Sequence, residues 1–198
     1  MARPVAKDYG TKRKLILDQA ARLFATDGFD RTSVSQVAQA CAISKANIYH
    51  YYGSKDDILF DILDAYLSAL SNRIIRMDLS GLSAQDQFRE TVKEILFAYQ
   101  GADFEHRLQT NELGHLPKPQ QDILLGYQRV LVSHVSHLVC AITPSVFIDD
   151  KSKLRATTMS VFGMLNWFFM WNPQADKPAR EDYAELVCAL CLKGFSGL

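Results

Sequence analysis

Apolar residues recur along most of the chain at the three- and four-residue spacing that is typical of amphipathic α-helices. Near the amino terminus this pattern predicts a helix over residues 11–26, which Gly28 ends as a C-terminal cap. The apolar face of that helix comprises Ile16, Ala20, Leu23 and Phe24.

Two short helices joined by a tight turn are predicted next. Ser33 and Ser44 each stand just before a helical run, where an N-cap hydroxyl is favoured. The positions expected to be buried are Val34, Val37, Ala38 and Cys41 in the first helix, and Ile48 and Tyr52 in the second. Polar and aromatic side chains of the second helix then face outward, as in helices that enter the DNA major groove. A helical hairpin that does not bind DNA would have the same hydrophobic pattern, so the pattern alone does not distinguish the two.

The remainder of the chain also has a helical period. A long helix is predicted from about Lys55 to Met77, capped by Ser54, and it joins two domains. Five further helices are expected over residues 84–100, 103–114, 117–142, 151–171 and 179–195, with a break at Thr143-Pro144. Strand-like alternation is absent from the sequence. The predicted fold is therefore all-α, with about nine helices.

Charge is unevenly distributed, although the net charge is zero. Residues 1–55 contain nine Lys and Arg against four Asp and Glu, whereas residues 56–198 contain thirteen against eighteen. This asymmetry favours a DNA-binding domain over 1–55 and a second helical domain over 56–198. A basic amino-terminal arm is expected to add nonspecific attraction to DNA, and its cations are Arg3, Lys7, Lys12, Arg13 and Lys14.

No stretch reaches the roughly 18 apolar residues that a membrane span needs, and residues 1–14 lack the apolar core of a signal peptide. A cytoplasmic protein without a membrane partner is expected. The four cysteines are Cys41, Cys140, Cys188 and Cys191. Because Cys188 and Cys191 lie inside an apolar helical run, we interpret them as reduced thiols, with a redox role as the alternative.

The segment Thr32–Lys55, together with Ala21-Arg22-Leu23-Phe24 and Gly28-Phe29, resembles the helix-turn-helix of the TetR family of bacterial transcriptional regulators. Two positions depart from the family pattern. Ala42 occupies the turn position where glycine is usual, and Ala46 stands where glycine or proline is common. Ala42 implies either a right-handed variant of the turn or local strain on the order of 1 kcal/mol.

The resemblance implies a ligand-responsive repressor, without a cofactor or catalytic activity, that binds a palindromic operator as a homodimer. By position, Ser35, Lys45, Ala46 and Asn47 face the groove, and Asn47 is suited to adenine. Tyr49 and His50 resemble phosphate-binding residues, Lys55 resembles a lysine that anchors the DNA backbone, and Ser33 and Ser44 are lesser candidates.

In TetR proteins the last two helices pack against their symmetry mates as a four-helix bundle. The corresponding helices of this chain are rich in apolar residues, which can instead serve as intramolecular core. The resemblance implies a dimer interface that contains Phe162, Leu165, Trp167, Trp171, Leu186, Leu190 and Cys191.

The second domain has many aromatic residues and a few polar ones that are expected to line a cavity for a hydrophobic effector. These residues are Tyr66, Phe88, Tyr99, Phe104, Asn111, Glu112, Tyr127, His134, Phe162, Asn166 and Phe169. Residues 111–117 and 162–167 resemble a TetR subgroup of phenylacetate and fatty-acid catabolism repressors that acyl-CoA thioesters release from DNA. The subgroup implies an acyl-CoA effector and phosphate-binding cations at the cavity mouth, for which the candidates are Arg73, Arg76, Arg107, Lys118 and Arg129.

Other functions have weaker support in the sequence. His134 with His137, and Glu112 with His115, have helical spacing that can bring them together at a metal. No phosphate-cradling glycine loop or nucleophile elbow is present, so an enzyme is not expected. A metal- or redox-sensing regulator, or a helical scaffold without DNA binding, remains as the alternative.

Overall fold

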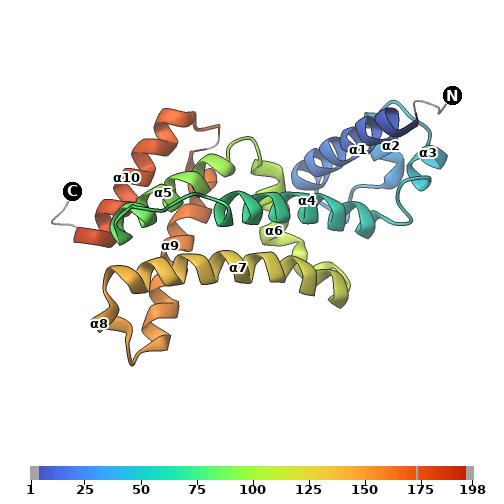
Figure 1. Cartoon of the computed structure of the whole chain (residues 1–198). Helices are drawn as coiled ribbons and strands as arrows, with labels where there is room; N and C mark the ends of the chain where they lie inside the picture. Colours follow the sequence, from blue (N-terminus) through green and yellow to red (C-terminus); the bar gives the residue numbers. More distant parts are fainter. Residues whose placement is uncertain (1–4, 173, 195–198) are drawn as a thin grey trace. The chain divides into compact units, whose positions relative to one another are not determined.

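A computed structural model describes residues 5–172 and 174–194, with side chains from Tyr9 onward. All regular structure within these ranges is helical, which confirms the all-α prediction (Figure 1). The elements are α1 (Val5–Asp27), α2 (Val34–Ala40), α3 (Lys45–Tyr49), α4 (Lys55–Ile75), α5 (Ala84–Ala98), α6 (Asp103–Asn111), the 3-10 helix η1 (Leu113–His115), α7 (Lys118–Ile142), α8 (Pro144–Phe147), α9 (Lys151–Trp171) and α10 (Lys177–Lys193).

Most helix positions agree with the hydrophobic pattern, and the differences have local causes. Helix α1 begins at Val5 rather than at Thr11. The break at Thr143-Pro144 ends α7 but also begins the additional short helix α8, because proline fits a first helical turn. Helix α6 ends at Asn111, earlier than predicted, and a 3-10 turn follows it.

The chain forms two compact units. The first contains the residues up to Leu67 together with Phe104–Leu124, and the second contains Ser68–Asp103 together with the residues from Leu125 onward. Helices α4 and α7 each contribute to both units. The functional boundary at residues 55/56 stays a prediction.

In the first unit, apolar faces of α1 to α4 form one core. Phe24, Val37, Ile48 and Leu59 are at most 1 % exposed, at the spacing that the sequence predicts. The carboxylate of Asp61 on α4 contacts both α1 and the end of the helix-turn-helix. The Asp61 carboxylate is paired with Arg13 and accepts a hydrogen bond of 2.5 Å from the Tyr52 hydroxyl. Burial, followed by the bond to Asp61, raises the pKa of Tyr52.

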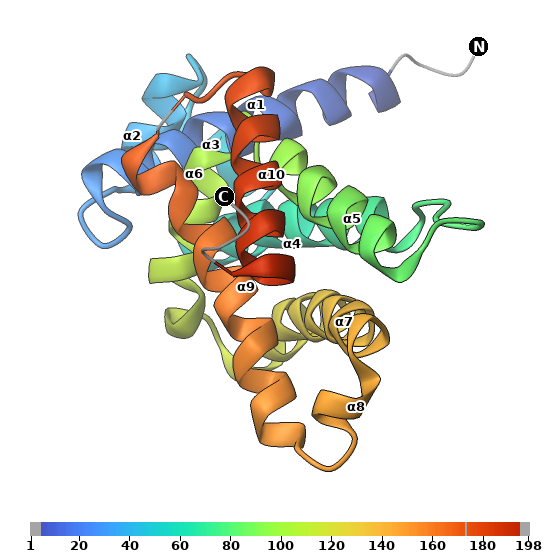
Figure 2. The same cartoon turned by 90° about the vertical axis from the view of Figure 1, so that its left-hand side faces the viewer.

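In the second unit, α5 lies alongside α10 (Figures 1 and 2). A buried arginine ties the two helices together. The Arg180 guanidinium, 1 % exposed, donates from Nη1 to the Leu96 carbonyl at 3.2 Å and from Nε to the Ala175 carbonyl at 3.0 Å. Since a buried charge is tolerated only when it is hydrogen-bonded, these carbonyls stabilise its position. Within the described chain, no helix has the length and apolar character that crossing a membrane requires.

Candidate nucleic-acid interface

Both short helices begin at capped serines, as the sequence predicts. Ser33 forms a capping box: its hydroxyl oxygen accepts from the Gln36 amide at 3.3 Å, and its own amide donates to Gln36 Oε1 at 2.8 Å. The Ser44 hydroxyl oxygen accepts from the Asn47 amide at 3.1 Å. These caps satisfy amides that a helix start leaves without partners, and they fix where α2 and α3 begin.

Helix α3 presents a polar face and buries a single apolar anchor. Ile48 has no exposed area, whereas Lys45, Ala46 and His50 are exposed and Asn47 is half-buried. Tyr49 is also exposed, and the Lys45 ammonium lies 5.8 Å from the centre of its ring, within range of a cation–π interaction. On α2, Ser35 is exposed. The structure therefore brings most predicted DNA-facing residues to the surface of α2 and α3.

The turn between α2 and α3 resolves the two alternatives for Ala42. Its φ is +54°, in the left-handed region, so the right-handed variant of the turn is excluded. The turn is closed by the Ile43 amide, which donates to the Ala38 carbonyl at 3.0 Å. A left-handed alanine is strained by contact between its Cβ and the backbone, which glycine avoids.

Lys55 has contacts that sequence reasoning missed. Its Nζ donates to the Phe29 carbonyl at 2.6 Å and lies 4.2 Å from the centre of the Phe29 ring. Thr32 reinforces the same loop, since its hydroxyl, almost fully buried, donates to the Gly28 carbonyl at 2.8 Å. These partners lie outside a helical period, so periodicity has no signal for them. The ammonium of Lys55 therefore ties the start of α4 to the loop after α1.

The predicted arm differs from expectation. Lys12, Arg13 and Lys14 belong to helix α1, and Arg13 is paired with Asp61 rather than held out for DNA. Lys14 forms an exposed ion pair with Asp18 at 2.7 Å, at the i, i+4 spacing of a helix. Arg3 and the side chain of Lys7 lie outside the described residues.

The predicted effector residues are divided between the two units. In the second unit, the Tyr99 hydroxyl donates to Asn166 Oδ1 at 2.7 Å. His134 Nε2 is buried without a hydrogen-bond partner. Burial, and then the nearby His137, lowers the pKa of His134. The remaining predicted residues of this unit are Phe88 and Phe162, which are buried, and Tyr127 and Phe169, which are half-buried.

In the first unit, the Tyr66 hydroxyl is 3.0 Å from Nδ1 of the buried His106, a partner that the sequence analysis did not identify. Phe104 and Asn111 are exposed. Glu112 is half-buried, and its Oε2 lies 3.2 Å from His115 Nδ1.

Two further polar atoms of this unit were also missed. The side-chain oxygens of Gln109 and Gln120 are buried without a hydrogen-bond partner. A buried polar atom of this kind requires an explanation, such as a bound water or ligand.

The apolar residues of α9 and α10 fall into two groups. Leu165 has no exposed area and Phe162 is 6 % exposed, so these two side chains leave little surface for a partner, and their place at a dimer interface stays a prediction. Both side chains pack inside their own chain. Trp167 and Trp171 remain 61 % and 56 % exposed, and Leu186 is 42 % exposed. Of the other predicted interface residues, Leu190 is half-buried and Cys191 is exposed.

The cysteines are free thiols in the described chain. Burial is the main cause that raises the pKa of Cys188 to about 12, so its thiol stays protonated and unreactive at neutral pH. Among the described residues, no three His, Cys, Asp or Glu side chains are grouped so that they could hold a metal ion.

These features define a helix-turn-helix protein with a separate helical unit, and comparison with known proteins gives its family. Residues 16–62 match the model of bacterial regulatory proteins of the tetR family, and residues 81–195 match the tetracyclin repressor-like C-terminal domain. The chain therefore belongs to the TetR family of transcriptional regulators. The matched proteins are regulators rather than enzymes.

Individual relatives agree with this assignment. The chain is 30% identical over 122 residues to the transcriptional repressor KstR2 of Rhodococcus jostii, covering 59% of this chain and 58% of that protein. Matches to two Bacillus subtilis regulators cover only 27% and 30% of their lengths.

Two solved structures are similar over most of their length. A TetR-family regulator from Bordetella parapertussis has a TM-score of 0.88 at 29% identity, with 94% of this chain and 96% of that chain covered. AibR, solved in complex with isovaleryl coenzyme A and operator DNA, has a TM-score of 0.75 at 18% identity, with 90% and 97% covered. At this identity AibR supports the fold alone.

Proposed function

We propose that this TetR-family chain is a ligand-responsive repressor that binds a palindromic operator as a homodimer. The observation that carries the proposal is the surface of α3, where one fully buried isoleucine, Ile48, holds a short helix whose other face is polar and exposed. Such a helix fits the major groove while the helix before it lies across the backbone. Binding to chromosomal DNA would also place the protein in the cytoplasm.

Each predicted DNA-facing residue has a role in this proposal. Asn47 hydrogen-bonds a base edge, preferably adenine, and Lys45, Ala46 and Ser35 border the same groove. Tyr49 and His50 contact phosphates and fix the register of the helix.

Three of the predicted residues also make hydrogen bonds within the protein, and these bonds limit their roles. The Ser44 hydroxyl accepts a capping bond and can still donate its hydrogen to a phosphate. The Ser33 hydroxyl already donates to Gln36 Oε1 at 2.9 Å, so we assign it to the cap. Because the Lys55 ammonium is bonded to Phe29, we assign the DNA contact there to the backbone amide of Lys55 at the start of α4.

The proposed dimer face consists of exposed apolar residues in the last two turns of α9 and on α10. Trp167, Met170, Trp171 and Leu186 are each at least 42 % exposed, and these include both tryptophans of the chain. Large side chains of this kind on adjacent surfaces mark protein–protein interfaces, where aromatic and methionine residues are enriched. A second copy of the chain is the proposed partner.

The proposed effector is a hydrophobic small molecule of the acyl-CoA type. Support comes from the resemblance of residues 111–117 and 162–167 to acyl-CoA-responsive repressors. The isovaleryl coenzyme A bound by AibR, a protein of the same fold, is consistent with it. To shift the protein from a mostly DNA-binding to a mostly non-binding conformation, the effector must bind the second conformation more tightly by about 5.5 kcal/mol. Burial of an acyl chain can supply a free energy of this size.

A titration tests DNA binding directly. The purified protein is added to a fluorescent duplex from the region upstream of its own gene, and anisotropy is recorded at several salt concentrations. We expect a saturable affinity that falls steeply with salt, because several phosphates are neutralised per half-site. Equal affinity for this duplex and for a shuffled one of the same composition would contradict operator recognition.

The effector is tested separately. Acyl-CoA thioesters of increasing chain length are added to the preformed complex, with coenzyme A and the free acids as controls. We expect one range of chain lengths to release the DNA while the protein remains dimeric. No release by any thioester would remove the acyl-CoA assignment and leave DNA binding intact.

A further inference from the structure

Three tyrosines of the first unit have hydroxyl groups that form no hydrogen bond within the described chain. Tyr9 lies on α1, Tyr49 is the last residue of α3, and Tyr51 follows shortly after it. Tyr9 is 48 % exposed and Tyr49 is 49 % exposed, while Tyr51 is half-buried. Four other tyrosine hydroxyls have partners inside the protein, and these belong to Tyr52, Tyr66, Tyr99 and Tyr183. The first three hydroxyls are therefore available to a partner outside the chain.

The rings of Tyr9 and Tyr51 are stacked, although the two residues are far apart in sequence. Their centroids lie 4.7 Å apart and their planes are inclined by 25°. This separation is within the range in which aromatic pairs attract each other. A tyrosine side chain is oriented by its two χ angles, and a ring packed on its face restricts both. The stack therefore limits the directions in which the Tyr51 hydroxyl can point.

Neighbouring contacts fix the backbone on both sides of the stack. Arg13 lies one helical turn after Tyr9 on α1 and is paired with Asp61 of α4. On the other side, the Tyr51 amide donates to the Ile48 carbonyl at 2.9 Å, directly after α3. The stack thus joins two segments of the first unit that are each held in place by other bonds.

We propose that Tyr9 is a positioning residue for DNA binding, because its ring orients the Tyr51 hydroxyl toward a phosphate beside the groove that α3 enters. The inference rests on the proposed repressor function and adds a residue of α1 to it. Tyr51 directly follows Tyr49 and His50, which contact phosphates in that proposal, and tyrosine hydroxyls commonly donate to phosphate oxygens. A side chain whose rotation is already restricted loses less entropy on binding, so the stack raises the affinity for DNA.

Four variants of the full-length protein separate the ring of Tyr9 from the hydroxyl of Tyr51. Tyr51→Phe keeps the ring and removes the hydroxyl. Tyr9→Phe keeps the stack and Tyr9→Ala removes it, and a double variant combines Tyr9→Ala with Tyr51→Phe. Each is titrated by anisotropy with the fluorescent upstream duplex and with its shuffled counterpart. Thermal unfolding checks that the fold is kept.

Leu15→Ala is the matched control on the same helix. It also shortens a large side chain of α1, one that is 40 % exposed. Its position along the helix puts it on a different face from Tyr9. This variant should bind the duplex as the wild type does.

Tyr51→Phe should weaken binding to the upstream duplex about tenfold, because a hydrogen bond to a charged group is lost. Tyr9→Ala should weaken it about threefold to tenfold, and Tyr9→Phe should bind as the wild type does. The double variant should bind no more weakly than Tyr51→Phe alone, since Tyr9 acts only through that hydroxyl.

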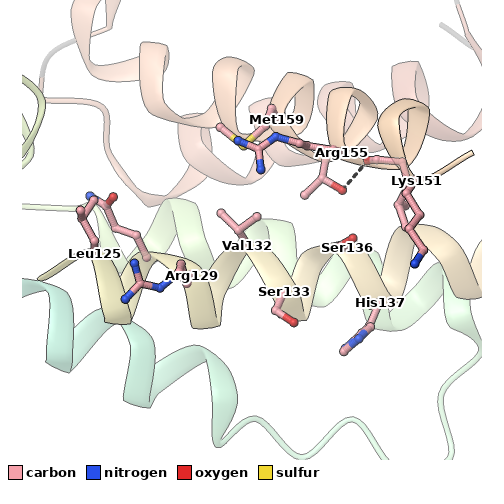
Figure 3. A pocket seen from close by; sticks show the side chains of 12 residues that line it. Leu125, Arg129, Val132, Ser133, Ser136, His137, Lys151, Arg155 and Met159 are labelled. Atoms are coloured by element: carbon pink, nitrogen blue, oxygen red, sulfur yellow. Dashed lines mark hydrogen bonds between the residues drawn. The ribbon is translucent and has the colours of Figure 1, made fainter. Parts of the chain in front are cut away.

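The salt dependence gives a second readout. Tyr9→Ala and Tyr51→Phe should leave the slope of log affinity against log salt unchanged, because a neutral hydroxyl releases no counterion. Lys45→Ala, which removes a cation from α3, should reduce the slope by about 1 per half-site. Arg155→Ala removes an exposed cation of the second unit, from the groove between α7 and α9 (Figure 3), and should change neither slope nor affinity.

Three results would each overturn the role of Tyr9. These are wild-type affinity in Tyr9→Ala, equal losses in Tyr9→Ala and Tyr9→Phe, and additive losses in the double variant, which would show that the stack only supports the fold. Failure of the proposed function has a different signature. Equal affinity of the wild-type protein for the upstream and the shuffled duplex would overturn operator recognition, and this inference with it.

Discussion

At the scale of single residues, Ala42 has a strained backbone conformation in the helix-turn-helix. The turn between α2 and α3 places this residue at a φ of +54°, where an L-residue with a Cβ is strained. The sequence predicted that the position was unusual, but two backbone conformations were compatible with it. The positive φ of Ala42 in the structure distinguishes them.

Replacement of Ala42 by glycine should therefore stabilise the protein by about 1 kcal/mol, since the strain is removed at some entropic cost. Urea denaturation followed by circular dichroism measures the free energy of unfolding. The matched control is Ala40→Gly, the same change at an exposed helical position, which should destabilise by up to about 1 kcal/mol. Destabilisation by both variants would show that Ala42 is not strained.

Asn47 is the residue on which base recognition should depend most. Asn47→Ala should weaken operator binding by about 1–3 kcal/mol and relax the preference at one base pair, because a bidentate contact is lost. Anisotropy titrations against the operator and single-base variants of it measure both effects. Asn72→Ala, an exposed asparagine on α4, should leave affinity unchanged. An Asn47→Ala variant with wild-type affinity and specificity would refute the assigned role.

Residue roles were predictable from sequence only where partners are local. The caps at Ser33, Ser44 and Ser54 are confirmed, because each hydroxyl bonds an amide three residues ahead. The contact of Lys55 with Phe29 joins residues 26 positions apart, and no periodic pattern encodes it.

At the scale of elements, helix α7 carries a histidine, His134, whose surroundings disfavour its protonated form. Burial is the larger cause that lowers the pKa of His134 from its ordinary value of 6.5, and repulsion by His137 adds to it. Well above pH 6.5 the imidazole is neutral in both the folded and the unfolded chain, so the titration of His134 does not change the free energy of unfolding. As the pH falls below 6.5, the unfolded chain binds the proton more readily, so folding is progressively disfavoured.

The stability lost between pH 7.5 and about pH 5.5 should therefore be smaller in His134→Gln than in the wild type. Chemical denaturation at each pH gives the free energies of unfolding. His137→Gln serves as the control on the same helix, because His137 is exposed and the burial of His134 persists in that variant. The same pH dependence in the wild type and His134→Gln would contradict the assignment.

Helix positions were largely predictable, because an apolar face recurs at 3.6-residue spacing whatever it packs against. Helix α9 spans residues 151–171 as predicted. The start of α1 and the existence of α8 were not predicted. For α8 the reason is that a proline that ends one helix and a proline that begins the next look alike in sequence.

At the scale of the whole molecule, the exposed tryptophans of α9 are the basis of the proposed dimer. The apolar pattern could not separate residues that fill the chain's own core from residues left for a partner. Leu165 and Trp167 are two positions apart, and one is fully buried while the other is 61 % exposed. That distinction depends on how α9 packs against neighbouring helices, which sequence alone does not give.

Trp167→Glu should convert the dimer to a monomer, because a charge in the centre of an apolar interface is desolvated without a partner. Sedimentation velocity measures the assembly, and operator affinity should fall by about 100-fold or more as bivalent binding is lost. Ile148→Glu provides the control, since this apolar residue is 76 % exposed but lies between α8 and α9. A dimeric Trp167→Glu variant would place the interface elsewhere.

The central claim is that two copies of α3, held by a symmetric dimer, recognise two half-sites on one duplex. Repeated selection of bound duplexes from a random DNA library, followed by sequencing, tests it most directly. The account predicts an enriched inverted repeat whose half-sites are centred about 10 base pairs apart, or a multiple of that spacing. Enrichment of a single unrepeated site, or of no site at all, would contradict it.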